Sequence, residues 1–185
     1  VDDSKVYQQA YLAIGKMIRV HGADVHFMLR RNKPRIAERE CIAELDEHHG
    51  VVTSLDMAWS GQLIVSASDD NSVLVWDVAT WKVAQRFVGH KSRVNSCRFS
   101  RSSELVLTSS EDTTVKVWNV STGAIETTLE GEHNAAVLCA AFSPDSVNVV
   151  SGAQDGSLVM WAVKTGVAAR TSGHLSAIHA VAYGE

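Results

Sequence analysis

Short apolar runs alternate with clusters of Ser, Gly, Asp and Asn over most of the chain, a pattern that predicts β-strands joined by tight turns. In one such stretch, strands are expected at 94–99, 105–108 and 124–129, with a further strand between the last two that ends on Trp118. Segments such as 73–76 are apolar at every position, which is typical of a strand buried on both faces. The pattern therefore indicates an all-β fold of packed four-stranded sheets.

The four-stranded unit recurs along the chain. Each unit carries a histidine, a hydroxyl residue 18 positions later, an aspartate four positions after that and a tryptophan six positions further on. The three sets are His48, Ser66, Asp70 and Trp76; His90, Thr108, Asp112 and Trp118; and His133, Ser151, Asp155 and Trp161. The tryptophans are 42 and 43 residues apart, and a repeat of this period indicates a repeat architecture.

Dipeptides in these units resemble the Gly-His and Trp-Asp signatures of the WD-repeat β-propeller family. The matching pairs are Gly89-His90, Gly173-His174 and Trp76-Asp77. The signature departs from the family pattern at Glu47-His48, Glu132-His133, Trp118-Asn119 and Trp161-Ala162. The resemblance covers residues 48–185. It implies a β-propeller arc of four-stranded antiparallel blades, with three complete repeats and a partial blade at each end.

The resemblance divides the chain at the histidines. Residues 48–89, 90–132 and 133–173 are expected to be complete repeats, and 174–185 the start of a further one. Residues 1–47 are expected to form a degenerate partial blade with two strands and a tight turn within 11–21, and a fourth strand at 40–45. A helix over residues 5–18 is the alternative, although Gly15 and the β-branched residues weaken it. Because closed propellers of the family have more blades, we expect a fragment of a longer protein or an arc completed by another chain.

Charge and composition narrow the choice of partners. The net charge is −4, and residues 1–47 contribute nothing to it, which argues against the broad basic field of a general nucleic-acid binder. The basic run at 30–35 is either a solvated loop or a contact for phosphate or an acidic partner. No apolar run approaches the roughly 18 residues of a membrane span. Cys41, Cys97 and Cys139 are too few and too scattered for a disulfide framework or a metal site.

A histidine, a hydroxyl and an aspartate together suggest a catalytic triad, but here the trio occurs in every unit. An active site needs one such constellation in one cleft, so the repetition indicates a structural role. The family resemblance implies a hydrogen-bonded chain from the tryptophan indole to the hydroxyl, the imidazole and the carboxylate. We find no phosphate-binding glycine loop and no zinc or nucleophile-elbow motif. No cofactor, metal or catalytic residue is therefore expected.

The expected function is that of a non-enzymatic protein-interaction scaffold in a eukaryotic intracellular complex, in the cytoplasm or the nucleus. Its expected partners are other proteins, with no membrane and no small-molecule substrate. One alternative is an RNA-associated scaffold in ribosome-biogenesis or splicing assemblies, which only the run at 30–35 favours. Another is a substrate receptor of a ubiquitin ligase. The arginine that such receptors carry three residues after the tryptophan is missing from all three units.

The family resemblance also implies where partners bind. These positions are the third and fifth residues after the histidine and the residue before the aspartate. They are Val51, Thr53 and Asp69; Arg93, Asn95 and Glu111; and Ala136, Leu138 and Gln154. Arg93 is the strongest candidate, because arginine is enriched at interface hot spots. The alternative is ordinary exposed surface.

Two tryptophans of the first unit occupy positions that hold other residue types in the other two units. Trp59 aligns with Arg101 and Pro144, and Trp81 aligns with Gly123 and Gly166, in turns expected on the opposite face of the blade. Tryptophan in place of glycine has no backbone advantage in a turn, so the side chain itself must have a use. Either the two indoles pack on each other or on the adjoining blade, or they form an aromatic patch that binds a partner.

Overall fold

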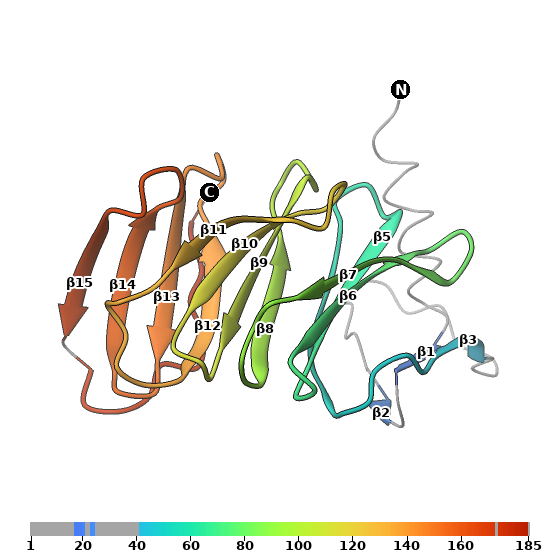
Figure 1. The fold of residues 1–185 in the computed structure, drawn as a ribbon, viewed down its shortest axis with the longest axis horizontal. Coiled ribbons are helices and arrows are strands. Elements are labelled where there is room, and N and C mark those ends of the chain that lie inside the picture. The colour runs from blue at the N-terminus through green and yellow to red at the C-terminus, as the bar shows by residue number, and fades with distance from the viewer. Residues whose placement is uncertain (1–16, 21–22, 25–40, 173, 185) are drawn as a thin grey trace.

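Three four-stranded sheets stand side by side in an arc (Figure 1). The computed structural model describes residues 17–20, 23–24, 41–172 and 174–184. Blade 1 comprises β4 (Val52–Met57), β5 (Leu63–Ser68), β6 (Ser72–Asp77) and β7 (Lys82–Val88). Blade 2 comprises β8 (Val94–Phe99), β9 (Leu105–Ser110), β10 (Val115–Asn119) and β11 (Ile125–Leu129). Blade 3 comprises β12 (Val137–Phe142), β13 (Asn148–Ala153), β14 (Ser157–Ala162) and β15 (Ala168–Ser172).

Within each blade the strands follow chain order and pair antiparallel, and the described residues contain no helix. The first strands β4, β8 and β12 lie next to one another across the blades, while β7, β11 and β15 are outermost. The predicted all-β arc of four-stranded antiparallel blades is confirmed. The alternation of strands also separates two faces. The histidine loops and the turns between second and third strands form the upper face, and the remaining turns form the lower face.

Equivalent turns adopt the same left-handed backbone conformation in every blade. Asn71, Thr113 and Gly156 occupy equivalent positions between second and third strands, with φ of 69°, 70° and 76°. Trp81, Gly123 and Gly166 do the same between third and fourth strands, with φ of 58°, 73° and 68°. We expected tryptophan to gain nothing from this turn, and the structure shows that it adopts the left-handed conformation all the same. Because that region is strained for a bulky side chain, the indole must be held by its surroundings.

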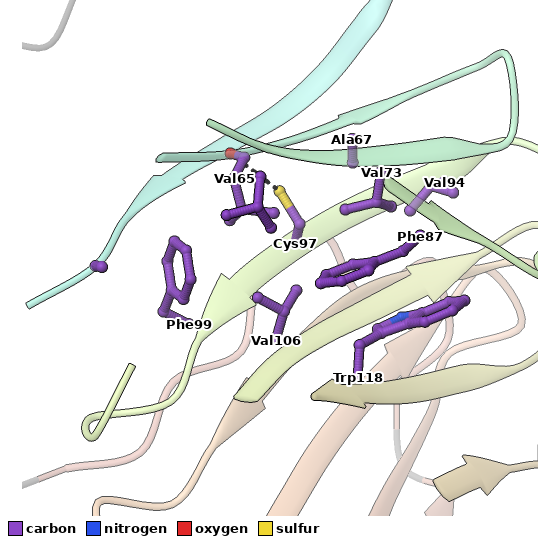
Figure 2. Packing of buried hydrophobic residues seen from close by; sticks show 11 residues of the cluster. Val65, Ala67, Val73, Phe87, Val94, Cys97, Phe99, Val106 and Trp118 are labelled. Carbon is purple, nitrogen blue, oxygen red and sulfur yellow. Dashed lines mark hydrogen bonds between the residues drawn. The ribbon is translucent and has the colours of Figure 1, made fainter. Parts of the chain in front are cut away.

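The cores lie between the blades and not within them. Between blades 1 and 2, Val65 and Phe87 of one blade meet Cys97 and Trp118 of the next (Figure 2). The Phe87 and Trp118 rings are stacked, with centroids 5.1 Å apart and planes 4° from parallel. Aromatic pairs of this kind stabilise by about 0.5–1.5 kcal/mol beyond their burial. The apolar third strands of blades 1 and 2 are thus explained, since both of their faces contact a neighbouring sheet, whereas Met160 in the third strand of blade 3 is 48% exposed.

The N-terminal part forms a small sheet of β1 (Met17–Val20), β2 (Ala23–Asp24) and β3 (Cys41–Leu45) in the order β2-β1-β3. The fourth strand expected at 40–45 corresponds to β3, whose Leu45 is buried against blade 1. However, β1 pairs with β3 in parallel, whereas a blade would pair them antiparallel. Parallel neighbours need a long connection, and about 20 residues separate these two strands. The other expectations for residues 5–16 and the basic run at 30–35 lie outside the described residues.

The described residues 174–184 contain no strand, although the start of a further blade was expected there. In each complete blade the first strand pairs with a second strand, and this segment has no such neighbour among the described residues. It still runs beside blade 3, because the Ile178 backbone N–H donates to the Ala153 carbonyl at 3.1 Å. The Cys139 thiol in turn donates to the Ile178 carbonyl at 3.4 Å.

Candidate functional site

In blade 1 the four recurring residues form one chain of hydrogen bonds. The Trp76 indole N–H donates to Ser66 Oγ at 2.8 Å, and the Ser66 hydroxyl donates to His48 Nε2 at 2.7 Å. The remaining ring nitrogen, Nδ1, then carries the proton and donates to Asp70 Oδ2 at 3.2 Å and to Ser72 Oγ at 3.1 Å. Because Ser66 donates its proton to Nε2, the neutral His48 ring carries its own proton on Nδ1, and the hydrogen bonds thus fix the histidine tautomer.

Blade 2 repeats this geometry more tightly. Trp118 donates to Thr108 Oγ1 at 2.8 Å, Thr108 to His90 Nε2 at 2.7 Å, and His90 Nδ1 to Asp112 Oδ2 at 2.8 Å. Asp112 also stabilises the turn between the second and third strands. Its other carboxylate oxygen accepts the backbone N–H and the hydroxyl of Thr114. The tryptophan, on the third strand, is thereby connected to the turn through the histidine of the loop that precedes the first strand.

Blade 3 departs from the expected chain at its last step. The Trp161 indole and the Ser151 hydroxyl take their expected places. His133 Nδ1, however, donates to Ser157 Oγ at 2.9 Å, and the Ser157 hydroxyl donates to Asp155 Oδ1 at 2.5 Å. Among the described contacts there is no direct hydrogen bond between imidazole and carboxylate in this blade. Asp155 is paired instead with Arg170, at 3.2 Å.

Burial and hydrogen bonding set the charge states of these chains. Burial lowers the pKa of His48 and of His133, so both imidazoles are neutral at neutral pH. For Asp70 and Asp112, burial alone would raise the pKa, but hydrogen bonds from Ser72, Thr114, the histidines and backbone N–H groups outweigh it and lower the pKa well below its usual value. Blades 1 and 3 thus hold a neutral imidazole and an ionised carboxylate in a connected network of hydrogen bonds.

The hydroxyls of these networks lack the properties of a nucleophile. Ser66, Thr108 and Ser151 are each 0% exposed. Each hydroxyl oxygen already accepts the indole N–H, and its own proton lies on the hydrogen bond to the imidazole. An activated nucleophile needs both a general base and room for a substrate. The second requirement is not met at these three positions.

On the upper face, the structure brings together the residues predicted to contact partners. Backbone hydrogen bonds join Asp69 to Val51, Glu111 to Arg93, and Gln154 to Ala136, at 3.0, 3.0 and 2.9 Å. The exposed members of the set are Val51, Asp69, Arg93, Glu111 and Gln154. Blades 1 and 2 therefore each present one exposed side chain from the histidine loop beside one from the turn, while blade 3 presents Gln154 from its turn.

The other predicted contact residues are partly buried, and two of them connect the blades. Thr53 Oγ1 donates to the Val94 carbonyl at 2.5 Å, and Asn95 Nδ2 donates to the Val137 carbonyl at 2.9 Å. Ala136 and Leu138 are half-buried. Thr53 and Asn95 thus use polar atoms that a partner would need, because they satisfy the carbonyls of the next first strand. Sequence reasoning missed this role, since it depends on contacts between repeats.

On the lower face, Trp59 and Trp81 make different contacts. The Trp59 side chain is 51% exposed, and the Arg101 guanidinium of blade 2 lies 5.3 Å from the centre of its ring. Its backbone N–H also donates to Ser103 Oγ, so the first turns of blades 1 and 2 are joined. Trp81 is half-buried and packs against the buried cluster of Leu45, Ile64, Leu74 and Trp76. The contact between Trp59 and Arg101 is packing on the adjoining blade.

A groove also lies on the lower face, between blades 2 and 3, with a volume of about 740 Å³. Turn residues 101–105 and 144–147 border it, together with Glu126 and Thr127 of the outermost strand β11. Sequence reasoning did not predict it, because its walls come from two repeats and its charges from positions that differ between repeats. It is a second candidate surface beside the upper face.

The described part of the chain contains neither a metal-binding group of side chains nor a candidate membrane-spanning helix. No three His, Cys, Asp or Glu side chains of residues 41–172 and 174–184 are grouped to hold a metal ion. The described residues include no helix long and apolar enough to cross a membrane. Cys97 and Cys139 are buried free thiols, and burial raises the pKa of Cys97 to about 12. Their thiol groups are therefore protonated at neutral pH.

Comparison with known proteins agrees with this geometry. Residues 39–77, 81–119 and 123–162, more than half of the chain, match the family model described as WD domain, G-beta repeat. The chain belongs to the WD-repeat family. Each match begins at the outermost strand of one blade and ends with the third strand of the next. The first match therefore includes β3 in the place of an outermost strand.

One similar solved structure is the crystal structure of the computationally designed Ika4 protein, which is 35% identical in sequence. The similarity covers 75% of this chain and 82% of that chain, with a TM-score of 0.66. A search of curated proteins found no match. The WD repeats are thus shown by the family model, while the partner has to be argued from the surface.

Proposed function

We propose that this WD-repeat chain is a non-enzymatic protein-interaction platform that acts within a eukaryotic intracellular complex, in the cytoplasm or the nucleus. WD repeats generally support scaffolding between proteins. One observation carries the proposal. The upper face places exposed side chains on turns that the buried hydrogen-bond chains hold in place. A rigid scaffold of this kind loses little conformational entropy on binding, which favours recognition.

The buried chains themselves support a structural role. All three share the hydrogen bonds from indole to hydroxyl and from hydroxyl to imidazole, and in all three the hydroxyl residue is closed to solvent. Loss of one member would leave the others unsatisfied in the interior, which costs about 1–3 kcal/mol per group. We therefore assign the three sets to the stability of the turns that carry the partner-binding surface.

Within the upper face, Arg93 is the proposed centre. It is exposed, and Glu111 is held beside it by a backbone hydrogen bond of 3.0 Å. Val51 and Asp69 on one side and Gln154 on the other extend the surface over three blades. Arginine supplies several N–H donors and an apolar stem, which explains its enrichment at hot spots. The mixed character of this surface suits a protein partner better than a phosphate backbone.

The experiment is affinity capture with the whole chain, read by mass spectrometry, for the wild type and for Arg93→Ala. Lys82→Ala is the matched control, since Lys82 is an exposed cation on the outermost strand β7. We expect Arg93→Ala to lose at least one partner that Lys82→Ala retains. If both variants retain every partner of the wild type, the upper face around Arg93 is not the binding surface.

The two alternative functions receive no support from the described contacts. The RNA-associated scaffold depends on the basic run at 30–35, which lies outside the described residues. The ubiquitin-ligase receptor depends on an arginine at positions that hold Ala79, Ser121 and Lys164. A salt-dependent RNA-binding measurement distinguishes the first alternative, because contacts with phosphates weaken steeply as salt rises.

A further inference from the structure

The lower-face groove between blades 2 and 3 has an apolar floor and a charged rim. Leu105, Val117, Val147 and Val163 form the floor: Val147 is 51% exposed and Leu105 is half-buried, while Val117 and Val163 are buried beneath them. The volume of about 740 Å³ lies within the range of roughly 300–1,000 Å³ that is usual for ligand sites. An exposed aliphatic side chain at the bottom of a groove is unfavourable in water, so cover by an apolar group would be stabilising.

The rim carries three carboxylates and two cations. Glu104, Glu126 and Asp145 line the groove together with Lys164 and with Arg101, whose guanidinium lies over the Trp59 ring. Asp145 accepts hydrogen bonds from the Ser143 hydroxyl and the Val147 N–H, which lower its pKa, so it stays ionised. The excess of negative charge around an apolar floor is complementary to a basic occupant.

The same boundary between blades 1 and 2 lacks these features. Gln62 stands where blade 2 has Glu104, Ala84 where it has Glu126, and Ser102 where blade 3 has Asp145. The three carboxylates are thus specific to one boundary and do not follow from the repeat. A structural requirement of the fold would place them at both boundaries, so their presence at one indicates a surface with its own use.

The outer wall of the groove favours an extended occupant. Glu126 and Thr127 belong to β11, the outermost strand of blade 2, whose outer side has no strand partner among the described residues. The register between β10 and β11 shifts next to Glu126, between the pairs Val117–Thr127 and Trp118–Ile125. Such a bulge redirects a side chain, and here the glutamate lines the groove. The Asn119 amide holds it by donating to Oε1 at 2.8 Å.

We propose that this groove binds an extended peptide segment of a partner protein, with an aliphatic side chain on the floor and a basic side chain on each side of it. The inference rests on the proposed function as an interaction platform and adds a second surface, on the face opposite Arg93. Glu104, Glu126 and Asp145 select the basic side chains, and Val147 contacts the aliphatic one. Trp59, beside Arg101, extends the surface toward blade 1.

The test is a titration of the whole chain, labelled at Leu and Val methyl groups, with the peptide acetyl-Gly-Lys-Leu-Lys-Gly-amide, followed by NMR. We expect saturable shifts at Leu105, Val117 and Val147. The double variant Glu104→Gln with Glu126→Gln should weaken binding about tenfold, since it removes two partly exposed charge pairs. The matched control is Glu44→Gln with Glu130→Gln, which removes the same charge from exposed positions outside both proposed surfaces. It should leave the affinity within about twofold of the wild type.

Several results would overturn the groove proposal. These are the absence of saturable shifts, equal shifts from Glu-Leu-Glu or Lys-Gly-Lys peptides, an equal loss in both double variants, or shifts outside the groove. Preferential binding of a short oligouridylate at the same methyl groups would also overturn it. Failure of the platform proposal looks different, because it appears in the capture experiment with Arg93→Ala and not in this titration. If the peptide does not bind in this titration while Arg93→Ala loses a partner in the capture experiment, the groove proposal is refuted and the platform proposal stands.

Discussion

Replacement of Trp118 by phenylalanine tests the buried hydrogen-bond chain of blade 2. The indole is 1% exposed, donates to Thr108 Oγ1 at 2.8 Å and stacks on Phe87 with centroids 5.1 Å apart. Trp118→Phe keeps an aromatic ring on Phe87 but leaves Thr108 without its donor. The lost hydrogen bond costs about 1–3 kcal/mol. The smaller ring adds a cavity cost of about 1 kcal/mol. We therefore expect the free energy of unfolding to fall by about 2–4 kcal/mol.

The measurement is urea unfolding followed by circular dichroism, because fluorescence would change with the loss of a tryptophan. Trp59→Phe is the control: its ring is 51% exposed, and the change should cost under about 0.5 kcal/mol. Thr108→Val removes the acceptor, and the double variant with Trp118→Phe closes a cycle whose coupling should exceed about 1 kcal/mol. An unchanged midpoint for Trp118→Phe, or costs that simply add in the double variant, would refute the hydrogen-bond chain.

Three further variants test the turns and the blade boundary. Thr113→Asn should raise stability by about 0.5–1 kcal/mol in urea unfolding, because Thr113 is β-branched at φ 70° and the equivalent Asn71 tolerates φ 69°; a loss of stability would contradict the strain. Trp81→Gly relieves strain at φ 58° but removes a half-buried indole, so a net loss of about 1–2 kcal/mol is expected, and a gain would show that the indole has no packing role. Burial raises the pKa of Asp56, so the folded state binds more protons than the unfolded state, and stability falls as pH rises above about 4. Asp56→Asn keeps an acceptor for the Phe99 N–H. The free energy of unfolding of the variant, relative to that of the wild type, should therefore rise between pH 3 and 7; a difference that does not change with pH would contradict the raised pKa of Asp56.

The sequence predicted the strands and the hydrogen-bonded sets because each is specified within one repeat. It could not predict the change in blade 3. All three blades carry a hydroxyl two residues after the aspartate: Ser72, Thr114 and Ser157. In blade 1, His48 Nδ1 lies 3.2 Å from the carboxylate and 3.1 Å from the hydroxyl, so the choice between them depends on shifts of a few tenths of an ångström. Residue types do not determine differences of that size.

The sequence also could not predict the contacts between repeats. Thr53 and Asn95 occupy positions at which family members bind partners, yet their polar atoms serve the carbonyls of the next first strand. The lower-face groove likewise combines the turns of two blades. Only the spacing of the blades shows which residues meet. The family resemblance predicts contact positions on the upper-face turns, and the structure separates the exposed side chains among them from those that join the blades.

Functional differences between the blades are therefore expected at positions where the shared hydrogen-bond chains and turns do not restrict the residue type. Trp76, Trp118 and Trp161 cannot change without loss of a buried hydrogen bond, and the left-handed turn positions restrict the residues that fit them. Glu104 and Glu126 face no such restriction, because Gln62 and Ala84 occupy the same places in blade 1 without altering the fold. A charge that the frame does not require, placed beside an exposed apolar floor, is a stronger indication of a binding surface than any residue shared by all three blades.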